Sequence, residues 1–536
     1  MLNSKTLHEV LFYSLTHFSD NPFMAFVGDK PITFAQFGTE VKKLQEKLIN
    51  CGVTYQDKVA ILGENSPSWA IAYFAIVDMG AIAVPLLADF TKDEARTCIN
   101  HSDAKLLFVS KRMEEKIDKD NYEHIQTIIS LDTFSEISSS PIKENEKGNY
   151  TIPKPEDLAS IIYTSGTTGF SKGVMLTHQN LTAQLVQIHN IWNITEKDVY
   201  LSVLPLSHTF ENSLGLLTAT MKGATIFYHN KLPVSKTFME SVAIVRPTTI
   251  LAVPLLMEKA YKNVIKPKLE NSFIKRILLT SPLFKRIMYR IAAKKLYASF
   301  GGRLTFFGIG GAKLDGETEL FLRLGKHFPY AIGYGLTETA PLIIGANPHQ
   351  VSWQTTGFPI KDVQLKIVDV NPQTGEGELL VKAPNVMKGY YKNPELTKEV
   401  FTEDGWFKTG DLVCEKKGRY EIKGRKKNVI LGSSGENIYP EEIEMVLNQH
   451  NLVLESVVIE RNGKLVAMVQ FNPEELQNRM AHIKENTAQA YENIKTELLK
   501  AVNIKLNKFS KLSLIVEYSK EFEKTATLKI KRYMYK

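Results

Sequence analysis

The first quarter of the chain alternates between short apolar runs and longer helix-like runs, and this alternation limits the fold more than any other feature. Residues 58–62, 81–86 and 106–110 are apolar and rich in branched side chains, which is typical of buried strands. Residues 69–79 and 91–100, which separate them, have the length and pattern of helices. Strands that alternate with helices favour a sheet that is wound with helices on its faces.

The last quarter of the chain has a different pattern, which indicates a second domain. Residues 440–448 predict a helix with Pro near its start, and residues 456–460 and 464–471 alternate like strands. Asn462-Gly463 between these strands is a strong hairpin signal. A long polar helix is expected from about residue 480 to residue 502. With 536 residues, the chain also exceeds the usual size of a single domain.

The predicted architecture is therefore α/β, with a large wound N-terminal α/β domain and a small, mobile α+β C-terminal domain. We expect the large domain to occupy residues 1–424, a hinge to occupy residues 425–427 and the small domain to occupy residues 428–536. Residues 134–150 are polar and rich in Ser, Lys and Glu, which predicts a loose connection within the large domain.

The composition argues against several classes of protein. Three cysteines are too widely separated for a disulfide framework or a metal site, which suits a reducing compartment, so we expect a cytoplasmic protein. Residues 69–87 are the one stretch that resembles a membrane span, but Asp78, Gly80 and Pro85 interrupt them, and the N-terminus lacks a signal-peptide pattern. The net charge of +8 is modest and no nucleic-acid-binding motif accompanies it, so no nucleic acid partner is expected.

Residues 163–173 form the most informative single segment for function. The sequence Tyr-Thr-Ser-Gly-Thr-Thr-Gly-Phe-Ser-Lys-Gly follows an apolar strand-like run. Glycines let backbone N–H groups turn toward an anion, hydroxyls add donors, and lysine adds a positive charge. The segment predicts a loop that binds a polyphosphate through Thr164, Ser165, Gly166, Thr167, Thr168 and Lys172. A Ser/Thr/Gly-rich surface turn is the alternative. The common phosphate loop is excluded because Gly173, not Ser or Thr, follows the lysine.

This loop resembles the signature of the adenylate-forming superfamily, although Ser171 stands where that family usually has Pro. Further segments resemble other motifs of the superfamily, and they occur in the same order along the chain: 205–211, 310–312, 334–339, 406–411, 424–427, 435–440 and 524–532. Each segment alone has a simple structural explanation, such as a turn or a solvated charge. Their shared order favours membership of the superfamily.

The resemblance implies a nucleotide site. Gly311 and Ala312 would lie beside the adenine and the acyl pocket, and Tyr334 and Gly335 would contact the adenine. Thr337 would donate to the α-phosphate of ATP, and Glu338 would hold Mg²⁺, which prefers carboxylate and phosphate oxygens. Asp411 and Arg425 would contact the ribose hydroxyls.

The resemblance also implies the groups that act on the acid and on the thiol. His208 maps to the substrate side, and Lys529 maps to the lysine that serves adenylation, although Leu528 stands where most relatives have Gly. Lys427 occupies the position of the hinge between domains. Gly435 belongs to a loop that lines the tunnel for the pantetheine of coenzyme A.

The implied reaction has two steps. A carboxylate attacks the α-phosphorus of ATP to give an acyl-adenylate and pyrophosphate, and the thiol of coenzyme A then displaces AMP. The variants at 204–211, 435–444 and 527–532 look most like long-chain fatty acyl-CoA synthetases. A ligase for a medium-chain or aryl acid, an enzyme that loads an acyl carrier protein, and a non-catalytic adenylate-binding sensor remain alternatives. The sequence gives no prediction of oligomeric state.

Residues 258–303 are rich in Lys and Arg and contain few acids. Within them, Phe284, Ile287, Met288, Ile291 and Ala292 fall on one helical face. A basic amphipathic helix of this kind can hold a protein at the inner face of an anionic membrane. The simpler alternative, which we prefer from the sequence, is a helix that packs its apolar face on the core.

Overall fold

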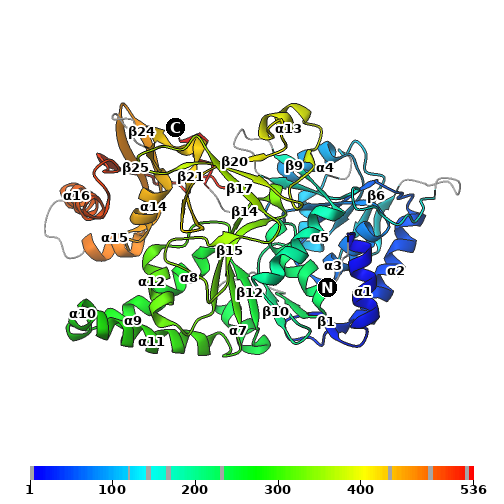
Figure 1. Cartoon of the computed structure of the whole chain (residues 1–536), viewed down its shortest axis with the longest axis horizontal. Coiled ribbons are helices and arrows are strands. Elements are labelled where there is room, and N and C mark those ends of the chain that lie inside the picture. The colour runs from blue at the N-terminus through cyan, green and yellow to red at the C-terminus, as the bar shows by residue number, and fades with distance from the viewer. Residues whose placement is uncertain are drawn as a thin grey trace.

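The computed structural model describes residues 5–118, 121–139, 147–164, 171–229, 235–431, 437–480, 487–525 and 530–535. Two large sheets with their helices form the bulk of the molecule, and a smaller unit built from the last quarter of the chain lies at one end (Figure 1). The predicted α/β class, with a large N-terminal part and a smaller C-terminal part, is confirmed.

The first large sheet has eight strands in the order β19-β9-β8-β4-β3-β5-β6-β7. Their bounds are β3 (Lys58–Leu62), β4 (Ile82–Leu86), β5 (Ala104–Val109), β6 (Thr127–Ser130), β7 (Glu136–Ser139), β8 (Leu158–Thr164), β9 (Lys172–Thr177) and β19 (Gly389–Tyr390). In β3, Val59 and Ile61 belong to one core cluster and Ala60 and Leu62 to another, so both faces of the sheet are buried. This is why its strands read as continuous apolar runs.

Helices cover the two faces of this sheet. Helix α3 (Pro67–Asp78) contributes to one core cluster and α4 (Lys92–Ser102) to the other. Helix α4 begins at a capping box, in which Thr91 and Glu94 each bind the other's backbone N–H. Helices α1 (Leu7–His17), α2 (Phe34–Asn50), α5 (His178–Gln187) and α6 (Thr218–Lys222) complete this half of the molecule.

The second large sheet has nine strands in the order β16-β15-β14-β13-β12-β10-β11-β1-β2. Their bounds are β1 (Pro22–Phe26), β2 (Ile32–Thr33), β10 (Val199–Ser202), β11 (Thr225–Tyr228), β12 (Thr249–Ala252), β13 (Phe306–Ile309), β14 (Tyr330–Gly335), β15 (Leu342–Ala346) and β16 (Phe358–Pro359). Its helices include α7 (Ser235–Val245), α8 (Pro254–Ala260), α9 (Lys266–Glu270), α10 (Phe273–Thr280), α11 (Pro282–Ser299) and α12 (Gly316–Gly325).

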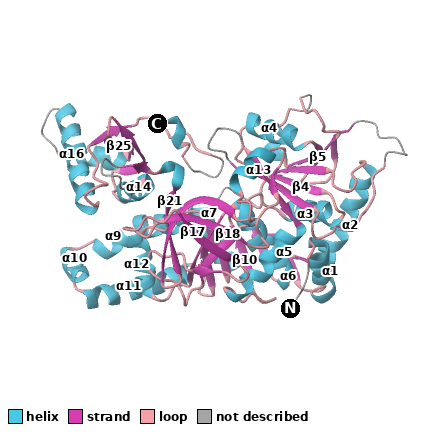
Figure 2. Ribbon diagram, turned by 45° about the horizontal axis from the view of Figure 1, so that its top comes forward, coloured by secondary structure: helices cyan, strands magenta, loops and turns pink. Residues whose placement is uncertain are grey.

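An antiparallel sheet of four strands joins the large sheets to the C-terminal unit (Figure 2). Its order is β17 (Gln364–Val368), β18 (Gly377–Lys382), β20 (Phe407–Lys416) and β21 (Arg419–Arg425). Helix α13 (Pro394–Val400) lies between β19 and β20 in the chain.

The C-terminal unit has a hydrophobic core cluster of its own, whose members all come from residues 430–515. Its sheet contains β24 (Val453–Arg461), β25 (Lys464–Phe471) and β26 (Leu514–Glu517), and it packs with α14 (Pro440–Asn448) and α16 (Thr487–Lys505). Asn462 and Gly463 have φ of 52° and 72°, as the predicted tight hairpin requires.

The structure adds detail to three local expectations. The helix expected over 480–502 corresponds to α16, which the structure describes over Thr487–Lys505, and a separate helix, α15 (Pro473–Met480), begins at Pro473. The loose connection expected over 134–150 contains β7, which pairs with β6. The strand β9 follows the predicted phosphate loop, and helix α5 begins directly after it at His178. Within the residues described, no helix has both the length and the apolar character needed to cross a membrane.

Candidate active site

The predicted phosphate loop lies between β8 and β9, which pair as antiparallel strands. Thr164 ends β8 and Lys172 begins β9, and the two residues are cross-strand partners. Ser165, Gly166, Thr167 and Thr168 lie outside the described residues. Pairing of Thr164 with Lys172 therefore holds both ends of the loop at one edge, with the lysine at its base.

A tyrosine that the sequence analysis missed lies beside the lysine. The Tyr390 ring centroid is 5.3 Å from the Lys172 ammonium, and the Tyr390 hydroxyl donates to Glu338 Oε1 at 2.9 Å. Burial and the Glu338 carboxylate raise the pKa of Tyr390, so it stays a donor at neutral pH. No local pattern marks this tyrosine, because it reaches the site through the antiparallel pairing of β19 with β9.

Thr337 and Glu338 sit in a single 3-10 turn, Thr337–Thr339, directly after β14. A side chain at Gly335 would place its Cβ 1.8 Å from the carbonyl oxygen of Pro341, so this position requires glycine. The backbone oxygen of Glu338 accepts from Met387 N–H at 2.8 Å. The turn is thus fixed on both sides, and it presents the Glu338 carboxylate toward Tyr390.

Tyr334, Asp411 and Arg425 form a hydrogen-bonded cluster. The Tyr334 hydroxyl donates to Asp411 Oδ2 at 2.5 Å, and Arg425 Nε lies 2.7 Å from Asp411 Oδ1. Asp411 and Arg425 are cross-strand partners in β20 and β21, which explains how residues 14 positions apart meet. Burial and the Asp411 carboxylate raise the pKa of Tyr334 well above its usual value.

The glycine turn after β13 contacts the segment that contains His208. Gly311 has a φ of 86°, and a Cβ at Gly310 would lie 3.1 Å from the Phe210 ring. His208 Nδ1 accepts from the Phe210 backbone N–H at 3.2 Å. Two motifs about 100 residues apart, which include Gly311, Ala312 and His208, are therefore neighbours in space.

The glutamate of the same motif is buried. Glu211 lies in a π-helical segment, Phe210–Leu217, and only 2% of its surface is exposed. Its Oε2 atom has no hydrogen-bond partner in the part of the chain that the structure describes. Burial raises the pKa of Glu211 to about 8, so the side chain is mainly protonated at neutral pH.

Glu211→Gln should make the stability of the protein less dependent on pH. The folded-state pKa of Glu211 is about 8 and its usual value is 4.5, so the folded protein binds the extra proton. The contribution to stability is full below pH 4.5 and is lost as the pH rises toward 8. As the pH rises across this window, the free energy of unfolding of the variant should increase relative to that of the wild type, by up to about 4 kcal/mol. Urea unfolding at pH 5, 6.5 and 8 measures this gain, and a constant difference between the two proteins would contradict it.

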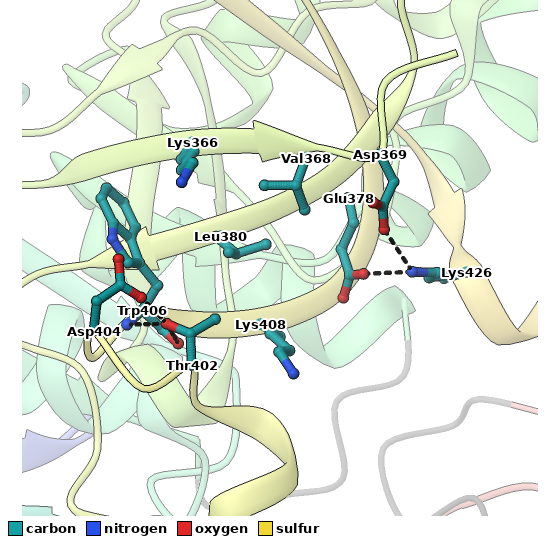
Figure 3. Close-up of a pocket in the computed structure, with 10 residues that line it drawn as sticks. All are labelled: Lys366, Val368, Asp369, Glu378, Leu380, Thr402, Asp404, Trp406, Lys408 and Lys426. Carbon is teal, nitrogen blue, oxygen red and sulfur yellow. Dashed lines mark hydrogen bonds and ion pairs between the residues drawn. The ribbon is translucent and has the colours of Figure 1, made fainter.

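Side chains at the expected hinge contact the four-stranded sheet on one side and the C-terminal unit on the other. Lys426 Nζ is 2.6 Å from Glu378 Oε2 and 3.4 Å from Asp369 Oδ2, both on the four-stranded sheet side (Figure 3). Asn428 donates to Glu441 of α14 at 2.7 Å. Lys427 stands between them in a short 3-10 turn, Lys426–Asn428.

Lys529 and Gly435 lie outside the described residues, but the chain just after Lys529 is described. Lys531 Nζ is 3.4 Å from Glu94 Oε1 of α4, and Arg532 forms an ion pair with Glu444 of α14 at 2.5 Å. Thr97 and Cys98 of α4 line a cavity of about 490 Å³ together with Lys172 and Tyr390. The C-terminal segment therefore contacts the helix that borders the cavity.

The residues present fit a nucleotide and a magnesium ion. The Tyr334 ring can stack on a nucleobase, and the neighbouring Asp411 carboxylate can accept hydrogen bonds from the two hydroxyls of a ribose. In the described residues, no group of three His, Cys, Asp or Glu side chains could hold a metal alone. Glu338 offers one carboxylate, and Mg²⁺ is commonly bound by one or two carboxylates plus substrate phosphates.

Comparisons with known proteins agree with this geometry. The model of the family described as AMP-binding enzyme matches residues 11–391. The chain is 30% identical to long chain acyl-CoA synthetase 6, peroxisomal, of Arabidopsis thaliana, over 88% of this chain and 74% of that protein. It is 28% identical to fatty acyl-CoA synthetase A of Dictyostelium discoideum, over 82% and 72% of the two chains.

Solved structures share the fold. The o-succinylbenzoate CoA synthetase from Bacillus subtilis, in complex with its acyl-adenylate intermediate, is 25% identical with a TM-score of 0.77, over 98% of this chain and 97% of that one. The anthranilate CoA ligase in complex with anthranoyl-AMP is 21% identical with a TM-score of 0.78, over 99% and 96%.

Proposed function

Because the chain belongs to the AMP-binding enzyme family, as an AMP-forming acid–thiol ligase that uses ATP, Mg²⁺ and coenzyme A, we propose that its acid is a long-chain fatty acid. The observation that carries the adenylation chemistry is the meeting of Lys172, Glu338 and the Tyr334–Asp411–Arg425 cluster from separate segments. The names of the curated relatives support the choice of acid, since they are fatty acyl-CoA and long chain acyl-CoA synthetases.

In this proposal the cluster holds the nucleoside of ATP. The Tyr334 ring stacks on the adenine beside Gly311 and Ala312, and the Asp411 carboxylate accepts from the ribose hydroxyls. Arg425, at 2.7 Å from Asp411, orients that carboxylate. Gly335 would let the backbone approach the nucleotide. A Cβ at this position would also clash with the carbonyl oxygen of Pro341, so only glycine fits here.

The phosphates would lie between the β8–β9 loop and Glu338. Thr164, Ser165, Gly166, Thr167, Thr168 and Thr337 would donate hydrogen bonds to them, and Lys172 would neutralise the outer phosphates. Mg²⁺, when bound at Glu338, supplies positive charge that offsets the repulsion between the acid and the triphosphate. The hydrogen bond from Tyr390 at 2.9 Å fixes the Glu338 carboxylate for this role.

The other residues predicted from the sequence would serve the acid and the thiol. Lys529 would bridge the carboxylate and the α-phosphate during the first step, and His208 would line the acyl side. The C-terminal unit would then turn about Lys427, as domains do in many enzymes, so that the loop at Gly435 admits the thiol. In this proposal the large domain spans residues 1–424, the hinge residues 425–427 and the small domain residues 428–536.

Two alternatives make different predictions. The fold-level neighbours include ligases of aryl acids, so an aryl or medium-chain acid, or a carrier-protein acceptor, is the second candidate. A sensor that binds adenylate without turnover is the third candidate, and the presence of Lys172, Glu338, Asp411 and Arg425 together argues against it. We further propose a reducing compartment such as the cytoplasm, since Cys51, Cys98 and Cys414 are unpaired and buried.

With palmitate or oleate, ATP, Mg²⁺ and coenzyme A, the purified protein should release pyrophosphate and AMP and form the thioester. Pyrophosphate release measured with a panel of long-chain, medium-chain and aryl acids, with and without coenzyme A, separates the candidates. A higher kcat/KM for an aryl acid than for palmitate would reject the long-chain assignment. Release of ADP, or of no product with any acid, would reject the ligase itself.

A further inference from the structure

The segment that contains α9, α10 and α11 carries an unusual charge. Residues 266–303 contain ten Lys and Arg residues and a single acid, Glu270, so their net charge is +9. The whole chain has a net charge of +8, and all other residues together therefore have a net charge of −1. The positive charge of this protein is concentrated in 38 residues at one extremity of the molecule (Figures 1 and 2).

The short helix α10, which the structure describes in full, contains no buried residue. Three of its apolar side chains are among the most exposed in the molecule: Phe273 at 76%, Ile274 at 70% and Ile277 at 53%. A helix that packs its apolar face on the core would bury these side chains. The core therefore does not cover the apolar side chains of α10.

Helix α11 has two apolar faces. One face, with Tyr289, Ala293 and Leu296, is buried, and Ala293 packs so closely on α12 that a Cβ at Gly325 would lie 2.5 Å from it. Met288 and Ala292 pack against the same core cluster. The single apolar face expected from the sequence is therefore divided, because Met288 and Ala292 contact the core whereas Phe284 and Ile287 are exposed.

The second apolar face of α11 is exposed. It contains Leu283, Phe284, Ile287 and Ile291, which are 65%, 46%, 44% and 54% exposed and recur at helical spacing. Basic side chains border this face on both sides: Lys295 on one, and Arg286, Arg290 and Lys294 on the other. We call the exposed apolar residues of α10 and α11 with these basic residues the α10–α11 surface.

We propose that the α10–α11 surface binds an anionic lipid bilayer. Apolar side chains bordered by Lys and Arg match the interface of such a bilayer, where apolar groups enter the acyl boundary and cations meet the headgroups. A second copy of the chain fits poorly, because two surfaces of like charge would repel each other. This inference rests on the proposed function and deepens it: a long-chain fatty acid resides in a bilayer, so binding there would bring the protein to its substrate.

The test is sedimentation of the full chain with vesicles, without ATP or acid, so it does not depend on the proposed activity. Vesicles of phosphatidylcholine alone are compared with vesicles that also contain phosphatidylglycerol. The wild type should sediment with the anionic vesicles only. Arg286→Gln/Arg290→Gln should weaken this binding roughly 25-fold, because each cation near an anionic surface contributes about fivefold. The matched control is Lys416→Gln/Lys417→Gln, on the β20–β21 hairpin.

A second pair of variants tests the apolar part. Ile274→Ser/Ile277→Ser should lower binding to anionic vesicles about tenfold or more, because two exposed apolar side chains are lost. Phe12→Ser/Ile504→Ser removes two apolar side chains that are 67% and 85% exposed elsewhere, and it should bind as the wild type does. Since α10 has no buried residue, these variants should keep the circular dichroism of the wild type.

Several results would overturn the proposal. These are a wild type that sediments with neither kind of vesicle, equal binding to both kinds, and losses as large in the control variants as in the surface variants. Sedimentation velocity adds a further outcome: a dimer that Ile274→Ser/Ile277→Ser abolishes would assign the surface to a second copy. Unchanged pyrophosphate release from a dissolved acid by the surface variants would show that any loss of vesicle binding is separate from catalysis.

Discussion

Replacing Lys529 with alanine should lower the rate of acyl-adenylate formation by about three orders of magnitude and leave thioester formation from supplied acyl-adenylate nearly unchanged. The first step brings a carboxylate to a triphosphate, and loss of a cation placed between two anions removes stabilisation that exists only in the transition state. In the second step the thiol forms a thioester with the acyl group and AMP leaves, so no two anions have to meet at this lysine.

The two half-reactions are measured separately, by exchange of labelled pyrophosphate into ATP and by formation of acyl-CoA from synthetic acyl-adenylate. The matched control is Lys524→Ala, in the same segment, because Lys524 pairs with Glu455 of β24, within the C-terminal unit, at 2.8 Å. This control should keep both rates within a few-fold of the wild type. Equal losses in both half-reactions of Lys529→Ala would assign this lysine a structural role instead.

Lys427→Pro should leave one half-reaction largely intact and slow the other by about two orders of magnitude or more. Proline fixes φ at residue 427 and removes its backbone N–H, so the turn can no longer change its backbone freely. Lys426 contacts Glu378 and Asn428 contacts Glu441, so this turn connects the two parts of the molecule. In this structure Lys531 contacts Glu94 near the cavity that contains Lys172, so we expect adenylation to be the step that survives.

Lys427→Ala is the matched control for this variant, because it removes the side chain and keeps the freedom of the backbone. It should support both half-reactions. If the proline variant also keeps both rates, the pivot lies elsewhere in the chain. If both rates fall together, circular dichroism and urea unfolding decide whether the turn has unfolded, and a folded protein with both rates reduced would reject the pivot.

The sequence by itself determined the element types and the order of the motifs. The strand β3 and the helix α3 follow from a buried apolar run and from the Ser66-Pro67 start signal, and these signals act within a few residues. The hairpin at Asn462-Gly463 was predictable because few residues other than Asn and Gly adopt positive φ readily. Such patterns are local, so they need no knowledge of the rest of the fold.

Only the tertiary structure decided which side chains meet and which faces are covered. Tyr390 reaches Glu338 through the pairing of β19 with β9, and Asp411 meets Arg425 through a strand register that no local signal sets. Glu211 has its pKa raised to about 8 because neighbours from distant segments exclude water from it. Helix α11 buries one apolar face and exposes another, and its sequence contains both. The physical reason is the same in each case: burial and contact depend on elements far apart in the chain, whereas periodicity reports only what each element can do alone.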